Sequence, residues 1–181
     1  MEQKSITISY LELKRGQNPQ GESIDIEGLR IEQLTIPCPA FNYFMYRAVG
    51  GEWFWIDKLT WSEKEWKKYV ERDNLQTWGA WQHGAPCGYF ELEQREGEIT
   101  EIAYLGILKQ FSGCGLGKKL LLEALAIAGR EGQQRVTVNT CSLDHPAALA
   151  NYLDRGMTIY HQETIEKTLP DITPTFWPGS L

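Results

Sequence analysis

The stretch that decides the fold is Ser112-Gly113-Cys114-Gly115-Leu116-Gly117-Lys118. It follows a strand-like run, Ile99–Ile107, and opens an amphipathic helical pattern that ends near Gly132. A helix N-terminus offers unpaired N–H groups and the positive end of a dipole, and glycines let a phosphate approach the backbone closely. A strand, a glycine-rich loop and a helix in this order therefore favour a phosphate-binding site in an α/β domain.

Two well-known phosphate-binding motifs do not fit this loop. The Walker pattern GxxxxGK[ST] requires a Ser or Thr after the lysine, and Lys118 is followed by Lys119. The dinucleotide fingerprint GxGxxG fails as well, because the glycines fall in the order GxGxG. Two interpretations remain: a shorter loop that holds a pyrophosphate, or a glycine-rich turn that only connects a strand to a helix.

Periodicity and turn residues predict the remaining elements. Helices are expected over residues 41–48, over 146–155, and from 60 or 62 to 71, where either Thr60/Glu63 or Ser62/Glu65 has the spacing of a capping box. Strands are expected over residues 6–13, 77–82, 87–94, 135–141 and 157–167, with a hairpin loop at 83–86. The chain is thus predicted to be one α/β domain with a mostly antiparallel front half and a β-α-β-α-β back half.

Composition and charge narrow the class of protein. A chain of 181 residues suits one domain and is short for two. The net charge of −6 gives no general attraction to nucleic acid or to anionic membranes. No apolar run approaches the roughly 18 residues of a membrane span, and the first residues lead into an alternating stretch unlike a signal-peptide core. The expectation is a cytoplasmic protein with no nucleic-acid or membrane partner.

Cysteines and histidines give no sign of a metal or of covalent chemistry. The four cysteines are far apart and form no CxxC pair, and the three histidines lack the spacing of metal ligands. Cys114 lies in the glycine loop, but no base accompanies it or Cys141 in the sequence, so both are interpreted as packing residues with reduced thiols. No metal is expected.

Around the glycine loop the sequence resembles the GNAT superfamily, the Gcn5-related N-acetyltransferases. The resemblance extends over roughly residues 78–163 and includes two motifs, one at 101–122 around the loop and one at 144–157 that reads Asp-His-Pro-Ala-Ala-Leu-Ala-Asn-Tyr-Leu-Asp-Arg-Gly-Met. The family usually places Arg or Gln where Ser112 stands; Gln110 fits the pattern literally, but two residues early. The register with Ser112 aligns the glycines and leaves one family contact to the cofactor without its usual side chain.

The resemblance implies an α/β (α+β) fold with a mixed central sheet of about six or seven strands, splayed between the fourth and fifth and flanked by helices. Residues 1–76 would form the half of the domain on the acceptor side, 77–167 the acetyl-CoA-binding core, and 168–181 an irregular tail. Dimers are common in this superfamily, so a homodimer is one expected arrangement.

The resemblance also implies acetyl-CoA as co-substrate. In the family, the strand before the loop bonds the pantetheine arm, one of its N–H groups polarises the thioester carbonyl, and the loop cradles the pyrophosphate. Gly106 is poor strand material and marks either a bulge or a close backbone approach. The residues expected to contact the cofactor are Leu105, Gly106, Ile107, Gly113, Cys114, Gly115, Leu116, Gly117, Lys118, Asn139 and Asn151.

Two catalytic residues follow from the same resemblance. Tyr152 matches the tyrosine that protonates the departing CoA thiolate in many members, and a phenol is neutral at physiological pH yet able to donate. Glu101 matches a glutamate that serves as general base in the histone-acetylating branch. Glu91, Glu93 or a water are alternatives for the base, and Glu91 or Glu93 could instead hold a cationic group of the substrate.

The expected acceptor is an amine on a small molecule or a peptide. Aromatic side chains and carboxylates alternate in the first half of the chain, a composition that suits an ammonium group through cation–π contact, although most of these rings are expected to form the core. The rings are Phe41, Tyr43, Phe44, Tyr46, Trp53, Phe54, Trp55, Trp61 and Trp66. The alternative to an enzyme is a non-catalytic module that binds acyl-CoA, and transfer through a cysteine is a more distant third.

Overall fold

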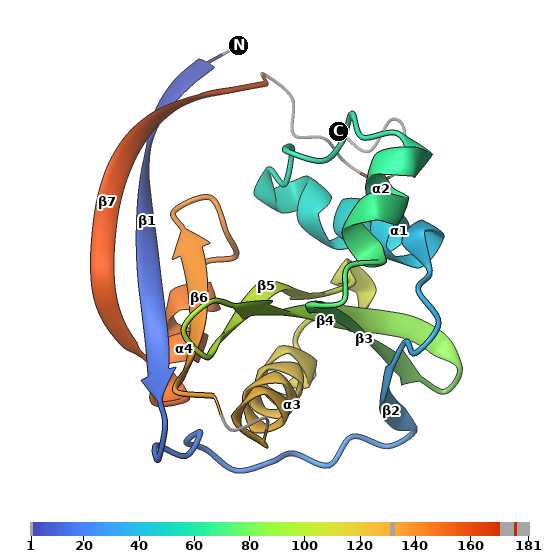
Figure 1. Ribbon diagram of the computed structural model, residues 1–181, viewed down its shortest axis with the longest axis vertical. Coiled ribbons are helices and arrows are strands. Elements are labelled where there is room, and N and C mark those ends of the chain that lie inside the picture. Colours follow the sequence, from blue (N-terminus) through green and yellow to red (C-terminus); the bar gives the residue numbers. More distant parts are fainter. Residues whose placement is uncertain (1, 131–132, 171–175, 177–181) are drawn as a thin grey trace.

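The computed structural model describes residues 2–130, 133–170 and 176, which form one mixed sheet with helices on both faces (Figure 1). The strands are β1 (Glu2–Lys14), β2 (Leu29–Gln33), β3 (Leu75–Gln82), β4 (Ala85–Arg95), β5 (Ile99–Ile107), β6 (Arg135–Cys141) and β7 (Thr158–Leu169). Their order across the sheet is β2-β3-β4-β5-β6-β1-β7. The predicted mixed α/β sheet flanked by helices is confirmed.

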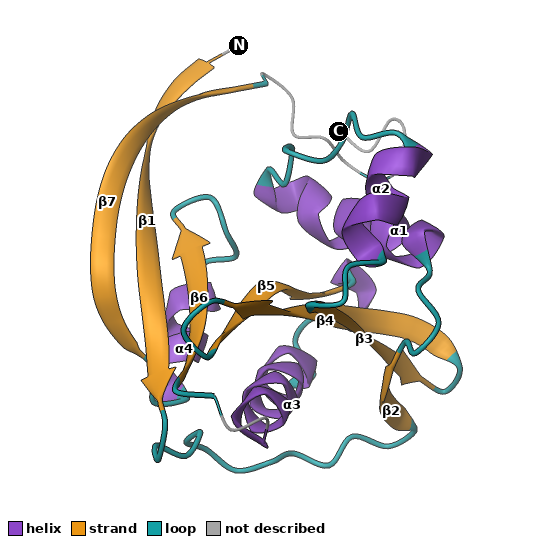
Figure 2. Cartoon of the chain, viewed as in Figure 1, coloured by secondary structure: helices purple, strands orange, loops and turns teal. Residues whose placement is uncertain are grey.

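Helices cover the two faces of the sheet around β4 and β5. They are α1 (Pro39–Gly50), α2 (Glu63–Val70), α3 (Leu116–Arg130) and α4 (Ala148–Asp154). Figure 2 shows α1 and α2 on one side of these strands and α3 on the other. The apolar face predicted for α3 is buried in the main core, and its buried members are Leu116, Leu120, Leu121, Ala124, Leu125 and Ala128.

The first strand lies far from the elements that follow it in the chain. β1 pairs antiparallel with β6, from Ile8 opposite Cys141 to Lys14 opposite Arg135, and with β7 on its other edge. Figure 1 shows β1 and β7 as a long curved ribbon beside β6. β1 therefore belongs to the half of the sheet that β6 and β7 form. It is separated from the other elements of residues 1–76.

β5 and β6 form the one parallel pair among the described strands, and they separate early. Their pairing covers only Ile99–Glu101 and 135–137, after which β5 continues to Ile107 bonded to β4 alone. These two strands are fourth and fifth in the order across the sheet, so the predicted splay is confirmed. Beyond Glu101, backbone N–H and C=O groups of β5 on the β6 side lack a strand partner and are available to a ligand.

The hairpin between β3 and β4 is tighter than the sequence suggested. The expected loop at 83–86 is a two-residue turn of His83 and Gly84, with φ values of 49° and 87°. Both residues are left-handed, which matches the twist of the flanking strands. The loop prediction was too long because Ala85 and Pro86 pair with Gln82 and Trp81 as part of the strand.

The N-terminus of α2 uses the second of the two expected capping boxes. Glu65 N donates to Ser62 Oγ at 3.4 Å, and Ser62 N donates to Glu65 Oε2 at 2.7 Å. We expect Ser62→Ala to lower the free energy of unfolding by about 1 kcal/mol, because it removes the acceptor for an N–H group of the first turn. Urea denaturation measures the change. Thr60→Ala is the control, and an equal loss in that variant would contradict the assignment.

The structure describes part of the predicted tail at residues 168–181. Residues 168 and 169 extend β7, while the rest of the expected tail, apart from 170 and 176, lies outside the described residues. Within the described part of the chain, no helix combines the length and the apolar character needed to cross a membrane.

Candidate functional site

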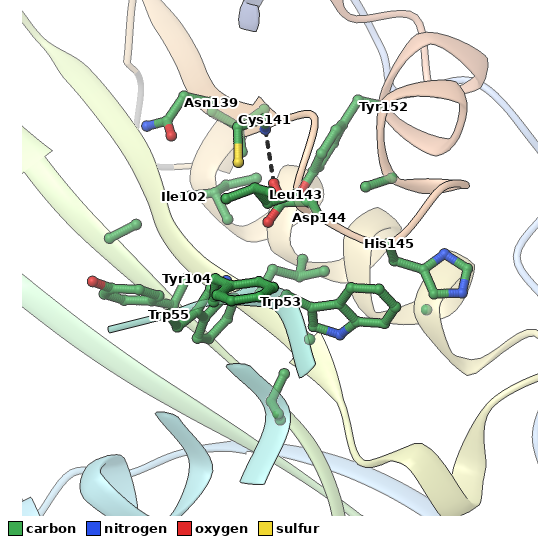
Figure 3. A pocket seen from close by; sticks show the side chains of 18 of the residues that line it. Trp53, Trp55, Ile102, Tyr104, Asn139, Cys141, Leu143, Asp144, His145 and Tyr152 are labelled. Carbon is green, nitrogen blue, oxygen red and sulfur yellow. Dashed lines mark hydrogen bonds between the residues drawn. The ribbon is translucent and has the colours of Figure 1, made fainter. Parts of the chain in front are cut away.

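A cavity of about 860 Å³ lies where β5 and β6 separate. It is lined by the second half of β5, the start of α3, the segment from Asn139 to Tyr152, and the loop between α1 and α2. Figure 3 shows Tyr152, Asp144 and Asn139 on one side and Trp53, Trp55 and Tyr104 on the other. The cavity thus joins the predicted cofactor side of the domain to the predicted acceptor side.

The glycine loop contributes its two ends to this cavity. Ser112, Gly113, Gly117 and Lys118 line it. Cys114, Gly115 and Leu116 do not: the Cys114 thiol donates to the carbonyl oxygen of Phe111 at 2.9 Å, and the Leu116 side chain is buried in the core. Their predicted contacts to a cofactor would have to come from the backbone.

The conformation of the loop depends on its glycines. Gly113 and Gly115 have φ values of 85° and 82°, a region that other residues rarely adopt. Gly117 lies in the first turn of α3 with open space beside it, since a Cβ there would meet only Ile107 Cδ1, at 4.0 Å. The helix start is therefore accessible to a phosphate from the cavity.

Leu105, Gly106 and Ile107 line the cavity along the unpaired edge of β5. Of the two interpretations of Gly106, the close approach is the one observed, because a Cβ there would collide with Val49 of α1. The bulge of this strand lies earlier, where the partner of β4 shifts from Ile102 to Tyr104. This shift places the side chains of Glu101 and Tyr104 on the same face.

Asn139 and Asn151 both line the cavity. Asn139 is exposed on β6, whereas the Oδ1 atom of Asn151 is buried and accepts no hydrogen bond from any residue that the structure describes. A buried acceptor without a donor is costly unless a ligand supplies one. An amide N–H of a bound pantetheine arm is a donor of the required kind, so the residues present fit the cofactor that the sequence predicted.

The phenol ring of Tyr152 lines the cavity. The side chain is 8% exposed, lies on α4, and its hydroxyl makes no hydrogen bond within the described part of the chain. Burial raises the pKa of Tyr152, and the negative charge of Asp144 adds to this effect. The phenol therefore stays protonated and able to donate.

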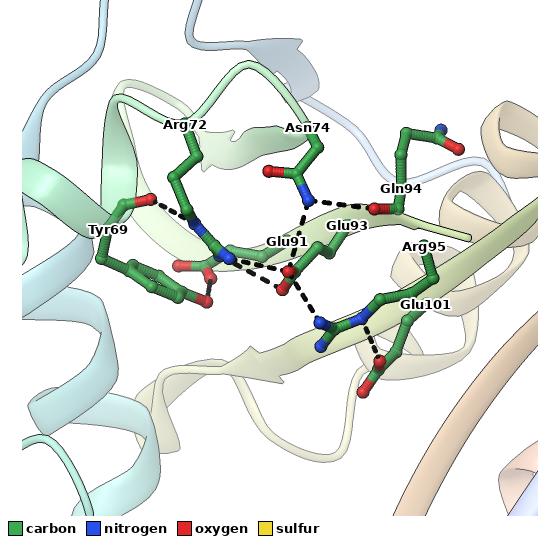
Figure 4. Close-up of polar contacts among 8 residues, drawn as sticks. All are labelled: Tyr69, Arg72, Asn74, Glu91, Glu93, Gln94, Arg95 and Glu101. Atoms are coloured by element: carbon green, nitrogen blue, oxygen red, sulfur yellow. Dashed lines mark hydrogen bonds and ion pairs between the residues drawn. The ribbon is translucent and has the colours of Figure 1, made fainter.

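Glu101 belongs to a network of alternating charges on β4 and β5 (Figure 4). Arg95 Nε donates to Glu101 Oε2 at 2.8 Å, and Arg95 Nη1 lies 2.9 Å from Glu93 Oε1. Arg72 holds the same Glu93 with two bonds, at 2.7 and 3.2 Å. Glu101, Glu93 and both arginines line the cavity.

Glu91, the other alternative for the base, is set back from the cavity. It is 1% exposed and does not line the cavity. Its oxygens accept hydrogen bonds from Asn42 Nδ2 at 2.7 Å and from Tyr69 Oη at 2.6 Å. Burial raises its pKa, while these two hydrogen bonds oppose the rise. Tyr69 lies between Glu91 and the cavity.

The aromatic residues of the first half divide between core and cavity. Of the nine rings predicted there, Tyr46, Trp53, Phe54 and Trp55 line the cavity. The centres of the Trp53 and His145 rings are 5.2 Å apart, and the rings meet edge-on. This contact joins the segment after α1 to the loop before α4. The expected rings that do not line the cavity are Phe41, Tyr43, Phe44, Trp61 and Trp66.

Among the cavity residues that sequence reasoning missed are Lys58, Tyr69, Arg72 and Tyr104. Nothing in their local sequence marks them, because they come from α2, the segments that flank it, and β5. A weak signal was available for Tyr104, which stands in the strand next to the glycine loop. Among the described residues, no group of three or more His, Cys, Asp or Glu side chains could hold a metal ion.

The chain is similar to known proteins in sequence and in structure. The sequence profile of the acetyltransferase (GNAT) family matches residues 42–157. Among proteins of curated function, no sequence matches the chain.

Three solved structures illustrate the structural similarity. A GCN5-related N-acetyltransferase from Sphaerobacter thermophilus has a TM-score of 0.71 at 16% identity, over 94% of this chain and 55% of that one. An aminoglycoside acetyltransferase from an uncultured soil metagenomic sample has a TM-score of 0.59 at 18% identity, over 71% of this chain and 87% of that one. The ribosomal-protein-S18-alanine N-acetyltransferase of Escherichia coli has a TM-score of 0.56 at 16% identity, over 71% and 76%.

Several of the similar structures extend well beyond the part that this chain matches. The chain covers between 54% and 64% of four of the similar structures. At identities this low, the structural similarity bears on the fold alone.

Proposed function

Because the chain belongs to the acetyltransferase (GNAT) family, we propose that it transfers an acetyl group from acetyl-CoA to a primary amine by direct attack. The observation that carries the proposal is the cavity at the splay of β5 and β6, which an accessible helix start and the free phenol of Tyr152 both face. The four cysteines form no disulfide, which suits a reducing compartment such as the cytoplasm.

Acetyl-CoA would supply the activated acetyl group. The start of α3 and the backbone of Gly113 would hold the pyrophosphate, with Lys118 beside them. Asn151 Oδ1 would accept a hydrogen bond from the pantetheine arm. The unpaired backbone between Leu105 and Ile107 would bond the same arm, and one of its N–H groups would polarise the thioester oxygen.

Proton transfer would fall to two side chains that line the cavity, Glu101 on β5 and Tyr152 on α4. Glu101 would accept the proton that an alkylammonium must lose before its nitrogen can attack, directly or through a water. Among the carboxylates considered for this role, Glu93 is already bound by two arginines and Glu91 does not reach the cavity. Tyr152 would donate its proton to the departing thiolate.

The test is release of free CoA thiol when the protein is incubated with acetyl-CoA and a broad panel of primary amines. We expect thiol release that depends on a particular amine and produces its acetylated form by mass spectrometry. Tight binding of acetyl-CoA without turnover across the panel would instead support the alternative, a non-catalytic acyl-CoA-binding module of the same fold.

A further inference from the structure

Charged side chains from β4, β5, β7 and the segments that flank α2 line one region of the cavity. They are Asp57, Lys58, Arg72, Glu93, Arg95, Glu101 and Lys167. Such a mixture can bind either a cationic or an anionic group of an acceptor. The choice depends on which of these charges the protein has already neutralised.

Every carboxylate in this region has a cationic partner. Arg72 and Arg95 hold Glu93, and Arg95 also holds Glu101 (Figure 4). Lys167 Nζ lies 3.1 Å from Asp57 Oδ1. An ammonium group arriving in this region would therefore meet carboxylates that a cation already neutralises.

Lys58 is the exception among the cations. Its Nζ has no carboxylate within ion-pair distance and no hydrogen bond in the described part of the chain. It lies over three rings instead, at 4.3 Å from the centre of Trp61, 4.8 Å from Tyr69 and 5.3 Å from Tyr104. Burial lowers the pKa of Lys58, while the nearby negative charges of Glu91 and Asp57 oppose that shift.

The contacts of Lys58 with these rings leave less aromatic surface for an ammonium group of the substrate. An ammonium group entering the cavity would find Lys58 already placed over the Tyr69 and Tyr104 rings. Aromatic faces satisfy positive charge but accept no strong hydrogen bond, so the three N–H donors of Lys58 are left for an anion. Arg72, whose guanidinium lies 4.4 Å from the Tyr69 ring, is already paired with Glu93, so Lys58 is the cation left for an anion here.

We propose that Lys58 binds a carboxylate of the acceptor, and that the amines this chain acetylates are therefore amino acids or similar compounds. The inference rests on the proposed acetyl transfer and adds the class of acceptor. Lys58 would form a charge-assisted hydrogen bond in a half-buried setting, where such bonds are strong.

Tyr104 and Gly106 are close neighbours on β5. Tyr104, which Lys58 overlies, is two residues from Gly106, the centre of the segment expected to hold the thioester. Two residues of a strand span about 7 Å. Lys58 and the segment expected to hold the thioester thus line the same cavity, close to neighbouring positions of one strand.

The experiment compares each acceptor with its neutral counterpart. Common amino acids and their primary amides are supplied with acetyl-CoA, and kcat/KM is measured for each. We expect the free acid to be preferred by roughly tenfold or more. The ratio should approach one in Lys58→Met, which keeps the apolar stem against the rings, and persist in Lys58→Arg. Lys64→Met, which removes an exposed lysine of α2 outside the cavity, should keep the preference of the unmodified chain.

A binding measurement separates this inference from the proposed function. The protein saturated with CoA is titrated with N-acetyl amino acids and with their amides, which requires no turnover. Tighter binding of the acids that depends on Lys58, without any thiol release, would uphold the anion site and remove the transferase. Turnover of amines lacking a carboxylate, with equal use of acid and amide, would uphold the transferase and overturn the role of Lys58. Failure of both acids and amides to bind would also overturn it.

Discussion

Replacement of Tyr152 by phenylalanine should lower kcat roughly a hundredfold, the low end of what a positioned general acid contributes. The affinity for acetyl-CoA should stay unchanged, because the ring that packs at the cavity wall remains. The fold should tolerate the change, since the hydroxyl has no hydrogen-bond partner among the described residues. Steady-state kinetics with an accepted amine and calorimetric titration with CoA measure the two quantities.

A matched control is available on β7. Tyr160 is exposed and does not line the cavity, so Tyr160→Phe should leave both kcat and CoA affinity as they are. An unchanged kcat in Tyr152→Phe would remove Tyr152 from the mechanism. A loss confined to CoA affinity would instead make Tyr152 a binding residue.

Replacement of Gly117 by valine should weaken CoA binding by roughly a hundredfold, because the added side chain would fill the space beside the helix start. This position is better suited to the test than Gly113 or Gly115, whose left-handed backbone would be strained by any side chain. At Gly117 the new Cβ makes only an ordinary contact, so the helix itself should persist. Equilibrium titration with CoA measures the loss.

The same substitution at the far end of α3 provides the comparison. Gly129 is exposed, and a Cβ there meets nothing within 4 Å. Gly129→Val should therefore bind CoA like the unmodified chain. If Gly117→Val bound CoA with full affinity, the pyrophosphate would have to lie elsewhere than at the start of α3.

Local elements were largely predictable from the sequence. The bounds of β5 and β6 were predicted to the residue, because β-branched and apolar runs there end at glycine-rich or polar turns. The capping box of α2 left two registers open, and only the structure chooses Ser62. The placement of β1 was not predictable, since alternation indicates that a strand forms but not which neighbour it takes.

The site was predictable where a motif spans it and unpredictable where it is assembled from distant segments. The glycine loop, β5 and Tyr152 belong to contiguous motifs, and the structure brings Gly113, Gly106 and Tyr152 to one cavity. The ion pairs of Glu93 and the ring contacts of Lys58 join residues on different elements. Their sequence neighbours carry no signal of these contacts, because a local pattern does not indicate which distant element a side chain meets.

The position of β1 has a consequence for how the protein is made. Its residues pair with partners far along the chain, Ile8 with Cys141 and Glu2 with Leu169. During synthesis this strand leaves the ribosome long before β6 and β7, so neither of its edges can be bonded until those strands have followed. Long-range pairing of this kind slows folding, and a long strand waiting with open edges is a site for association with other chains. Expression yield should therefore depend on synthesis rate and chaperone supply more than the small size of the domain suggests.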